Sequence, residues 1–210
     1  MAFAAIVHSY DPEEVALSGV LRKCCEMWVR VPELGRPGPV EALFQRELAK
    51  VTSPDAAKGR MRYHVIDSSF AESASGVVEE RSVAATCVSF FKQIETAAGK
   101  RHILGIGGVA TAPEYRRKGL GRAVVEAAFS RCRPHAGMFA EDGSCALFQT
   151  SARAFYEKLG AGVIDRTSIW NTKAGKLSFW DRFALVWPAD ARAALQPSAS
   201  DIIDTLGPGW

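Results

Sequence analysis

The chain has 210 residues, of which 48% are hydrophobic and 23% are charged. This composition is typical of a soluble globular protein with one domain or at most two small ones. Twenty-six Lys and Arg against twenty-three Asp and Glu give a formal net charge of +3, which is too near balance to favour binding to nucleic acid or to a membrane surface. The longest uncharged runs, such as residues 103–113, reach about half of the ~20 apolar residues that a membrane span needs.

The first eleven residues lack the basic start and the long apolar core of a signal peptide, and acidic residues begin at Asp11. We therefore expect a cytoplasmic protein. The five cysteines have no Cys-x-x-Cys pair and no histidine at zinc spacing, and we expect free buried thiols rather than a disulfide or a metal site. These cysteines are Cys24, Cys25, Cys87, Cys132 and Cys145.

The first third of the sequence predicts a strand followed by helices. Residues 3–8 form a short apolar run that fits a strand. Ser9 or Asp11 can then cap a helix that has Pro12 at its first position and two acids in its first turn, and apolar residues at helical spacing extend this helix over 12–29. Residues 31–39 form a loop rich in Pro and Gly, and residues 40–51 are helical again.

The remaining two thirds predict strands alternating with two helices. Strands are expected at 61–68, 83–94, 102–111, 145–148, 162–170 and 183–187, helices at 119–132 and 151–159, and a loop at 70–76. Gly160 is expected to end the second helix, and the tail from Pro188 is expected to be a Pro/Gly-rich surface segment. The order predicts a mixed α/β protein with some antiparallel pairing.

One glycine motif matches a dinucleotide fingerprint but lacks its setting. Residues 105–110 read Gly-Ile-Gly-Gly-Val-Ala, and such glycines bind a pyrophosphate only where they open a helix. Pro113 interrupts that helix, and the acid expected about twenty residues on would be Glu126, inside a later helix. Nicotinamide or flavin binding is therefore not favoured, and the sequence contains no P-loop motif.

A stronger signal lies at residues 109–122, where a strand and a turn at Pro113 lead through a basic loop into an amphipathic helix. Gly119 and Gly121 allow close approach of the backbone to a ligand, and the first N–H groups of a helix have no intrahelical partner. Such a helix start binds anions, pyrophosphate in particular. Four basic residues in seven strengthen the attraction; they are Arg116, Arg117, Lys118 and Arg122.

These residues resemble a known family. Arg116-x-x-Gly119-x-Gly121 is similar to the acetyl-CoA pyrophosphate loop, Gln/Arg-x-x-Gly-x-Gly/Ala, of the GNAT superfamily of N-acetyltransferases. Residues 149–160, Gln-Thr-Ser-Ala-Arg-Ala-Phe-Tyr-Glu-Lys-Leu-Gly, resemble the family's Asn-x-x-Ala-x-x-Phe-Tyr-x-x-x-Gly segment. The resemblance implies an α/β (α+β) GNAT fold, a mixed and mostly antiparallel sheet of about six to seven strands flanked by about four helices. It also implies one domain over 1–210, with a CoA-binding core at about 102–160 and a C-terminal tail at 188–210.

The resemblance further implies acetyl-CoA as co-substrate, without a metal. It assigns CoA binding to Val109, Ala110, Thr111, Arg116, Arg117, Lys118, Gly119, Leu120, Gly121 and Arg122. The N–H of Val109 or of Ala110 would stabilise the oxyanion, and Tyr156 would protonate the departing thiolate. Against these roles stand two simpler ones: the basic loop as a solvated helix start, and Tyr156 as a core aromatic beside Phe155.

Segments near both ends are similar to aminoglycoside 2'-N-acetyltransferases and, at the tail, to nodulation N-acyltransferases, which modify amines on sugars. These segments are residues 6–8, 185–188 and 201–210. The chain departs from the aminoglycoside enzymes in having Gly107 where they have an acid before the CoA loop, and Pro208 and Gly209 near the end, where they have another. Both departures argue against a polycationic drug as acceptor.

A primary amine must lose a proton before it attacks, since with a pKa near 10.4 only about one molecule in 2,500 is neutral at pH 7. The sequence does not single out the base. The candidates are His64, His102, Glu80, Glu95, Asp204 and the C-terminal carboxylate.

Three functions remain open. The first is N-acetyl transfer to an amine-bearing small molecule, with an amino sugar as one candidate. The second is acetylation of protein lysines or N-termini in a groove lined by 30–39 and 171–177, and the third is a CoA-binding sensor without turnover. A homodimer is implied only at the level of the family. The net charge fits a compact phosphate ligand, because residues 116–133, up to Arg133, hold six bases and one acid, while the other 192 residues hold twenty bases and twenty-two acids.

Overall fold

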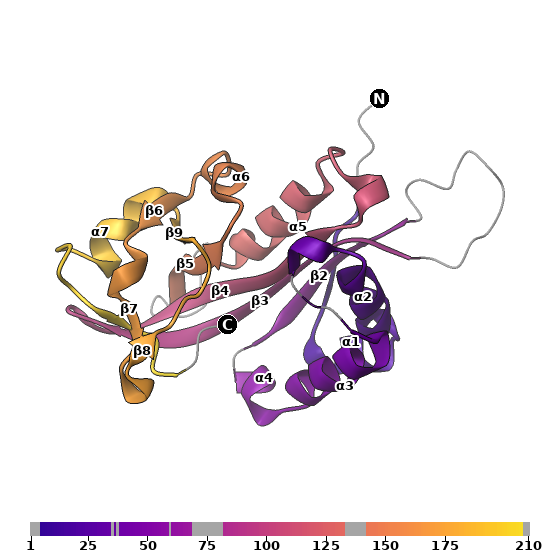
Figure 1. Cartoon of the computed structure of the whole chain (residues 1–210), viewed down its shortest axis with the longest axis horizontal. Helices are drawn as coiled ribbons and strands as arrows, with labels where there is room; N and C mark the ends of the chain where they lie inside the picture. Colours follow the sequence, from indigo (N-terminus) through magenta and orange to yellow (C-terminus); the bar gives the residue numbers. More distant parts are fainter. Residues whose placement is uncertain are drawn as a thin grey trace. The chain divides into compact units, whose positions relative to one another are not determined.

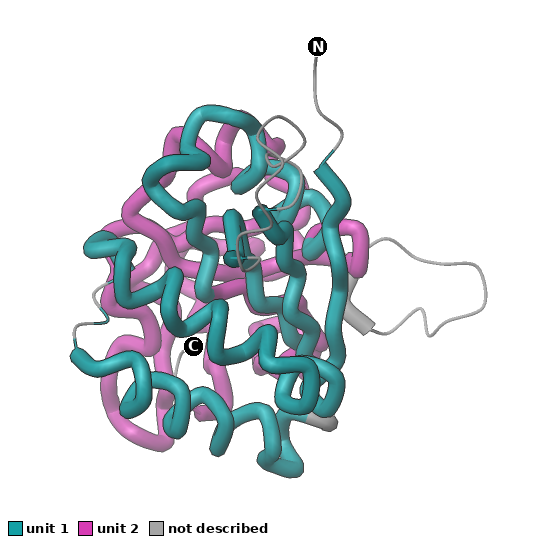
Figure 2. Tube along the Cα trace, turned by 90° about the vertical axis from the view of Figure 1, so that its right-hand side faces the viewer, with its two compact units in different colours: residues 1–90, 108–128 teal, residues 91–107, 129–210 magenta. Residues whose placement is uncertain are grey.

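The computed structural model describes residues 5–34, 36, 38–58, 60–68, 82–132 and 142–207, without the side chains of 57, 58 and 142–144. Residues 3–4 of the first predicted strand, the loop at 70–76, Glu80, Arg133 and the terminal residues 208–210 with their carboxylate lie outside the described residues. The chain divides into two compact units, residues 1–90 with 108–128 (unit 1) and residues 91–107 with 129–210 (unit 2) (Figure 2).

Unit 1 holds the predicted N-terminal helices and the start of the sheet. In chain order its elements are β1 (His8–Tyr10), α1 (Pro12–Leu17), α2 (Val20–Val29), the single 3-10 turn η1 (Pro32–Leu34), α3 (Val40–Val51), α4 (Pro54–Lys58) and β2 (Arg62–Asp67). It also contains the first part of β3 (Val83–Thr96), the last part of β4 (Gly99–Thr111), the 3-10 turn η3 (Pro113–Tyr115) and most of α5 (Leu120–Phe129).

The helix predicted over 12–29 is interrupted. Asp11 caps α1 as expected, in a capping box: its carboxylate accepts the N–H of Glu14 at 2.9 Å, and the Glu14 carboxylate accepts the N–H of Asp11 at 2.8 Å. The helix stops at Ser18 because Gly19 has a φ of +73°, which a right-handed helix does not accommodate. The prediction of one continuous helix was therefore wrong, whereas α3 begins and ends where the apolar spacing indicated.

The strands of unit 1 lie between two helical layers. β1 pairs with β2 and β2 with β3, both antiparallel, and β4 neighbours β3. Figure 1 shows α1–α3 on one side of these strands and α5 on the other. Apolar side chains of α1–α3 pack with those of β2, β3 and the end of β4 in one core, which includes Trp28, Tyr63 and Ala110. The first strand starts at His8 rather than near residue 3.

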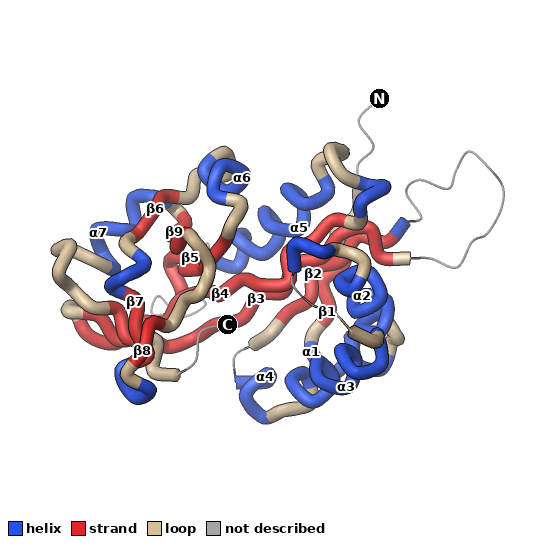
Figure 3. The backbone as a smooth tube through the Cα atoms, in the orientation of Figure 1, coloured by secondary structure: helices blue, strands red, loops and turns tan. Residues whose placement is uncertain are grey.

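Unit 2 carries most of the strands. Besides the shared parts of β3 and β4 it contains η4 (Ser130–Cys132), β5 (Asp142–Thr150), α6 (Arg153–Glu157), β6 (Gly162–Ile164), η5 (Arg166–Ser168), β7 (Ile169–Asn171), η6 (Thr172–Ala174), β8 (Lys176–Leu177), β9 (Phe183–Trp187), η7 (Ala189–Ala191), α7 (Arg192–Leu195) and β10 (Ile203–Asp204). The short helices α6 and α7 flank β5, β6 and β9 (Figure 3).

The sheet is mixed, as expected, and has more strands than expected. Its order is β6-β9-β5-β4-β3-β10-β7-β8, and off this path β2 pairs with β3 and β1 with β2, which makes ten strands in the described part of the chain. The β4–β5 and β10–β7 pairs are parallel, and the pairs β3–β10, β5–β9, β6–β9 and β7–β8 are antiparallel. The additional strands β7, β8 and β10 have two or three residues each, too few for a periodic pattern to reveal.

Two predictions for the C-terminal part were wrong. The strand expected over 162–170 is divided into β6 and β7, because Asp165 caps the intervening turn η5 by accepting the N–H of Thr167 at 2.9 Å. The tail from Pro188 is not a surface segment throughout. Leu195 and Ile203 are fully buried in the core of unit 2, and β10 inserts between β3 and β7.

Other predictions were confirmed. The Gly105–Ala110 segment lies within β4 and opens no helix, as the rejection of the dinucleotide motif requires. Gly160, at φ +86°, follows the end of α6, and the N–H groups of Gly160 and Ala161 return to the carbonyls of Glu157 and Tyr156. All five cysteines are buried, as expected.

Candidate functional site

The segment between β4 and α5 has the backbone geometry that the sequence indicated. Pro113 starts the turn η3, and Leu120 begins α5, which has ten residues. Between them Arg117 has a φ of +62° and Gly119 a φ of +81°. A positive φ is uncommon and costly for a residue such as arginine. The backbone therefore adopts a left-handed conformation at two residues just before a helix start, where N–H groups lack intrahelical partners.

The basic side chains of this loop are exposed, and some of them contact other side chains of the protein. Arg116, Arg117, Lys118 and Arg122 are exposed, while Leu120 is buried and anchors the helix start. Lys118 Nζ lies 5.2 Å from the centre of the Tyr115 ring, and Arg122 Nε lies 2.8 Å from a carboxylate oxygen of Glu126 one turn on. The loop thus presents cations and helix N–H groups together, which favours an anionic ligand.

Two ion pairs attach the loop to the end of α2 and to η1. Both terminal nitrogens of Arg116 donate to the carboxylate of Glu33 at 3.0 Å, and Arg116 Nε donates to the carbonyl of Thr111 at 3.4 Å. Arg30 donates to the carboxylate of Glu114 at 2.7 Å. The hydrogen bond from Arg116 lowers the pKa of Glu33. The guanidinium of Arg116 is therefore occupied by a side chain of the protein, which the motif alone did not indicate.

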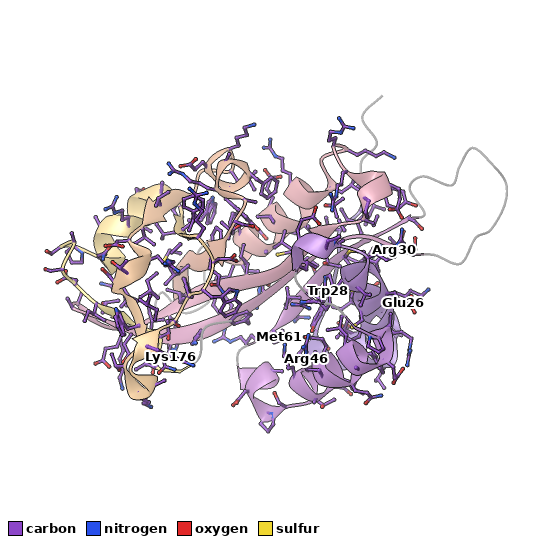
Figure 4. The ribbon with its side chains drawn as sticks, in the orientation of Figure 1. Glu26, Trp28, Arg30, Arg46, Met61 and Lys176 are labelled. Atoms are coloured by element: carbon purple, nitrogen blue, oxygen red, sulfur yellow. The ribbon has the colours of Figure 1, made fainter. Side chains whose placement is uncertain are left out.

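The carbonyl of Gly108 in β4 is held by two side chains. Thr86 Oγ1 donates to it at 2.7 Å, Trp28 Nε1 donates to it at 3.2 Å, and Trp28 Nε1 also donates to Thr86 Oγ1 at 2.8 Å. Trp28 and Thr86 are buried, and Trp28 is labelled in Figure 4. Gly108 has a φ of +57° inside the strand, the geometry of a β-bulge.

The next residues of β4 are those assigned to the pantetheine arm. Val109 and Thr111 are half-buried, and Ala110 is buried. Past the strand, the N–H of Ala112 donates to the carbonyl of Ala84 in β3 at 2.9 Å. The described register of β4 with β5 ends at Leu104 and Ala146.

Tyr156 lies in unit 2, on α6, and its side chain is 5% exposed. Its ring centre lies 4.7 Å from that of Phe148 and 4.8 Å from that of Phe155, the latter edge to face. The structure thus bears out the aromatic packing beside Phe155 that the sequence offered as the alternative. The two roles do not exclude each other, because a tyrosine ring can pack while its hydroxyl makes polar contacts.

Gln149, which stands where the family segment has Asn, has a structural contact. Its Oε1 accepts the N–H of Trp180 at 2.9 Å and that of Asp181 at 3.1 Å. It thereby fixes the turn that precedes β9, on which the Trp180 side chain is 69% exposed.

Two of the described candidate bases, His64 and Asp204, have contacts that limit them. His64 is 2% exposed, and its two ring nitrogens lie 2.8 Å from the hydroxyls of Ser9 and Ser89. Burial tends to raise the pKa of Asp204, but hydrogen bonds from Thr172 and Leu206 outweigh this and leave it lowered. A carboxylate stabilised in this way is a poor proton acceptor.

Thiol and metal chemistry find no support among the described residues. Burial raises the pKa of Cys145 to about 11 and that of Cys25 and Cys132 to about 12, so these thiols stay protonated at neutral pH. No group of three or more His, Cys, Asp or Glu in the described ranges could hold a metal ion. No helix in these ranges has the length and apolar character of a membrane span.

The family is decided by comparison with known families. The model of the "Acetyltransferase (GNAT) family" matches residues 44–161, more than half of the chain. The chain belongs to this family. The matched range of the GNAT domain contains the β4–α5 loop, the bulge at Gly108 and Tyr156. No curated protein matches the chain in sequence.

Three solved structures are similar to this chain, and the first of them agrees with it in fold. A GNAT-family acetyltransferase from Staphylococcus aureus Mu50 is 12% identical, with 87% of this chain and 98% of that chain covered and a TM-score of 0.52. A GCN5-related N-acetyltransferase from Kribbella flavida is 18% identical, with 78% and 34% covered and a TM-score of 0.48. Glucosamine-6-phosphate N-acetyltransferase from Arabidopsis thaliana is 20% identical, with 74% and 89% covered and a TM-score of 0.48. The chain spans about a third of the length of the Kribbella protein.

The residues assigned to CoA from the sequence fall together in unit 1 of this GNAT chain, whereas Tyr156 belongs to unit 2. The sequence missed Glu33, Glu114, Thr86 and Trp28. The acids Glu33 and Glu114 could have been suspected as partners of a basic loop. Thr86 and Trp28 gave no signal, because nothing in a buried threonine or tryptophan distinguishes a hydrogen bond to a particular carbonyl.

Proposed function

We propose that the protein transfers the acetyl group of acetyl-CoA directly to a primary amine of a small molecule, with an amino sugar as one candidate acceptor. The observation that carries the proposal is the loop between β4 and α5, which has Arg117 and Gly119 at positive φ directly before a helix start. Loop, helix terminus and exposed cations together suit a pyrophosphate. GNAT acetyltransferases act on amines of small molecules or proteins.

In this proposal the backbone N–H groups of Gly119, Leu120 and Gly121 bind the pyrophosphate. Arg117, Lys118 and Arg122 supply positive charge around it. Arg116 acts mainly as a brace, because Glu33 occupies both of its terminal nitrogens. Close approach to these N–H groups is easiest where the side chain is absent, which accounts for glycine at 119 and 121.

The end of β4 would align the thioester. Val109, Ala110 and Thr111 hydrogen-bond the pantetheine arm through the main chain and hold the reacting carbonyl near the amine, and such positioning is a major part of the catalysis. Of the two N–H groups considered for the oxyanion, that of Val109 fits better. Main-chain groups alternate in direction along a strand, and since the N–H of Ala112 points to β3, that of Ala110 does too and that of Val109 points to the opposite edge.

Tyr156 would donate its proton to the departing thiolate. With ordinary pKa values of about 10 for tyrosine and 8.5 for a thiol, complete proton transfer is uphill by only about 2 kcal/mol. This cost is small enough for tyrosine to act as a hydrogen-bonding acid. The amine nitrogen forms its bond to the acyl carbon as the carbon–sulfur bond breaks. The proton of the amine passes to a base or to water.

The proposal is tested by release of free CoA thiol from acetyl-CoA in the presence of single amines: an amino sugar, an aminoglycoside, a polyamine and a lysine peptide. Turnover with a small-molecule amine supports it. Turnover with the peptide alone overturns the assignment of a small-molecule acceptor in favour of a protein acetyltransferase. Binding of acetyl-CoA without turnover on any amine supports a sensor. Gly107, which stands where the aminoglycoside enzymes have an acid, is compatible with that role.

The CoA site is tested separately by Gly121→Asp, which places bulk and negative charge where the pyrophosphate would lie. Calorimetric titration with acetyl-CoA should then show no measurable binding. Ser130→Asp adds the same charge beyond the far end of the same helix and should leave binding intact. Retained affinity in Gly121→Asp would mean that the loop is not the pyrophosphate site.

A further inference from the structure

A chain of hydrogen bonds runs from α2 to the main chain of β4. The indole N–H of Trp28 donates to the Thr86 hydroxyl at 2.8 Å, and this hydroxyl donates to the Gly108 carbonyl at 2.7 Å. The same indole N–H also reaches the Gly108 carbonyl directly, at 3.2 Å. Thr86 is fully buried and Trp28 is 1% exposed, so water does not compete for these bonds.

The bonds determine the direction of the N–H of the next residue. The Gly108 carbonyl and the Val109 N–H belong to one planar peptide group, and in a trans peptide they point in opposite directions. Two donors on the carbonyl hold the plane of this group from one side. The Val109 N–H is therefore held toward the other side, the edge of β4 opposite β3.

A second observation gives the same direction. The N–H of Ala112 donates to the carbonyl of Ala84 in β3, and counting back three residues along an extended strand reverses the direction. The Val109 N–H thus points away from β3 by strand alternation as well as by the fixed peptide plane. The argument lies wholly within unit 1.

We propose that Thr86 and Trp28 are positioning residues for acetyl transfer: they orient the 108–109 peptide and polarise it, so that the Val109 N–H is a preorganised donor to the thioester oxygen. The proposal rests on the proposed function. Hydrogen bonds in a chain strengthen one another, and a carbonyl that accepts two of them makes the N–H of its own peptide group a better donor. A donor fixed in advance needs no reorganisation when negative charge develops.

The glycine at position 108 is needed for these hydrogen bonds. A Cβ at this position would lie 3.0 Å from Cζ2 of the Trp28 ring and 3.4 Å from Cγ2 of Val88. The absence of a side chain lets the indole lie against the strand, and the positive φ turns the carbonyl to the indole N–H and the Thr86 hydroxyl.

The kinetic test compares three variants with the most rapidly acetylated amine of the panel. Thr86→Val removes the hydroxyl and should lower kcat about tenfold, less than the loss of a complete oxyanion donor because Trp28 still holds the carbonyl. The KM for acetyl-CoA should stay within about twofold. Thr86→Ser keeps the hydroxyl and should restore kcat. Thr96→Val is the matched control, since Thr96 is a buried threonine of the same strand whose hydroxyl donates to the Gly99 carbonyl at 3.0 Å.

A readout without turnover separates this proposal from the proposed function. The amide nitrogen resonance of Val109, followed in labelled protein, should move in Thr86→Val and in Trp28→Phe but not in Thr86→Ser or Thr96→Val. If wild type transfers acetyl to no amine but the resonance behaves as stated, the proposed function fails and the orientation of the peptide stands. An unchanged Val109 resonance in Thr86→Val, or an unchanged kcat in the folded variant, overturns the positioning role.

Discussion

The substitution Gly108→Ala examines the contact between the bulge in β4 and Trp28. Alanine at φ +57° adopts a left-handed conformation, which costs about 1–2 kcal/mol. In addition, its Cβ would lie 3.0 Å from the indole, so the ring must move by roughly half an ångström to reach an ordinary carbon–carbon distance. The ring is 1% exposed and is held by two hydrogen bonds, so it cannot withdraw freely.

Overpacking of this kind costs about 1–3 kcal/mol, in addition to the cost of the left-handed backbone. The lower entropy of the unfolded alanine chain offsets part of this sum. We therefore expect Gly108→Ala to lower the free energy of unfolding by about 2–4 kcal/mol. Gly175→Ala is the matched control. Gly175 has φ +61°, and a Cβ there would meet nothing within 4 Å. In this control only the cost of the left-handed backbone applies, so its free energy of unfolding should fall by at most about 1.5 kcal/mol.

Urea denaturation followed by tryptophan fluorescence measures both values. The difference between the two variants isolates the contact with the indole, because the φ angles differ by only a few degrees. Equal losses in Gly108→Ala and Gly175→Ala would refute the packing argument. A larger loss in Gly175→Ala would show that backbone strain, rather than the ring, decides the cost.

Three further outcomes are expected. Glu33→Gln should weaken binding of acetyl-CoA by about two- to fivefold, because the brace on Arg116 is lost, as calorimetry would measure. Tyr156→Phe should lower kcat with little change in affinity for acetyl-CoA, since it removes only the acid. Burial lowers the pKa of Lys92 to about 8, although Asp204 opposes the shift. Lys92→Met should therefore raise the free energy of unfolding at pH 7 by about 1–2 kcal/mol, less than the full pKa shift corresponds to, because solvent screens the half-buried charge.

Each of these outcomes has a control or a contrary result. Glu41→Gln breaks a pair with Arg22 of similar exposure, at 2.9 Å, and should leave binding unchanged; tighter binding in Glu33→Gln would mean that Glu33 competes with the phosphates. Unchanged kcat in Tyr156→Phe would leave Tyr156 as a packing residue only. Between pH 8 and 10.5 the unfolded chain holds the Lys92 proton more tightly, so the stability of wild type rises with pH and the advantage of Lys92→Met should vanish above pH 10.5.

The sequence predicts this fold best where a signal is local. Asp11 and Glu14 form their capping box within four residues, and α3 has its apolar side chains at regular helical spacing. The break at Gly19 was missed because the apolar spacing continues across it, and one left-handed residue outweighs that pattern. Leu195 and Ile203 are isolated apolar residues in a polar tail, and only the completed sheet gives them a core to enter.

The candidate site divides in the same way. The loop at 116–121 is visible in the sequence because its glycines and cations stand next to one another. The hydrogen bonds to the Gly108 carbonyl come from residues 22 and 80 positions away, and their side-chain types are ordinary for a core. The same is true of Glu33, which lies 83 positions from Arg116. Contacts of this range require the three-dimensional structure.

The place of β10 in unit 2 has a consequence for the completion of the sheet. It is the last described strand along the chain, yet it lies inside the sheet, with β3 on one side and β7 on the other. Without β10, the edge of β7 at residues 169–170 and that of β3 at Glu95 would lack this partner, and unpaired strand edges invite pairing with other chains. The described sheet of unit 2 is therefore complete only when residues 203–204 are in place, although they come after every other described strand in the chain.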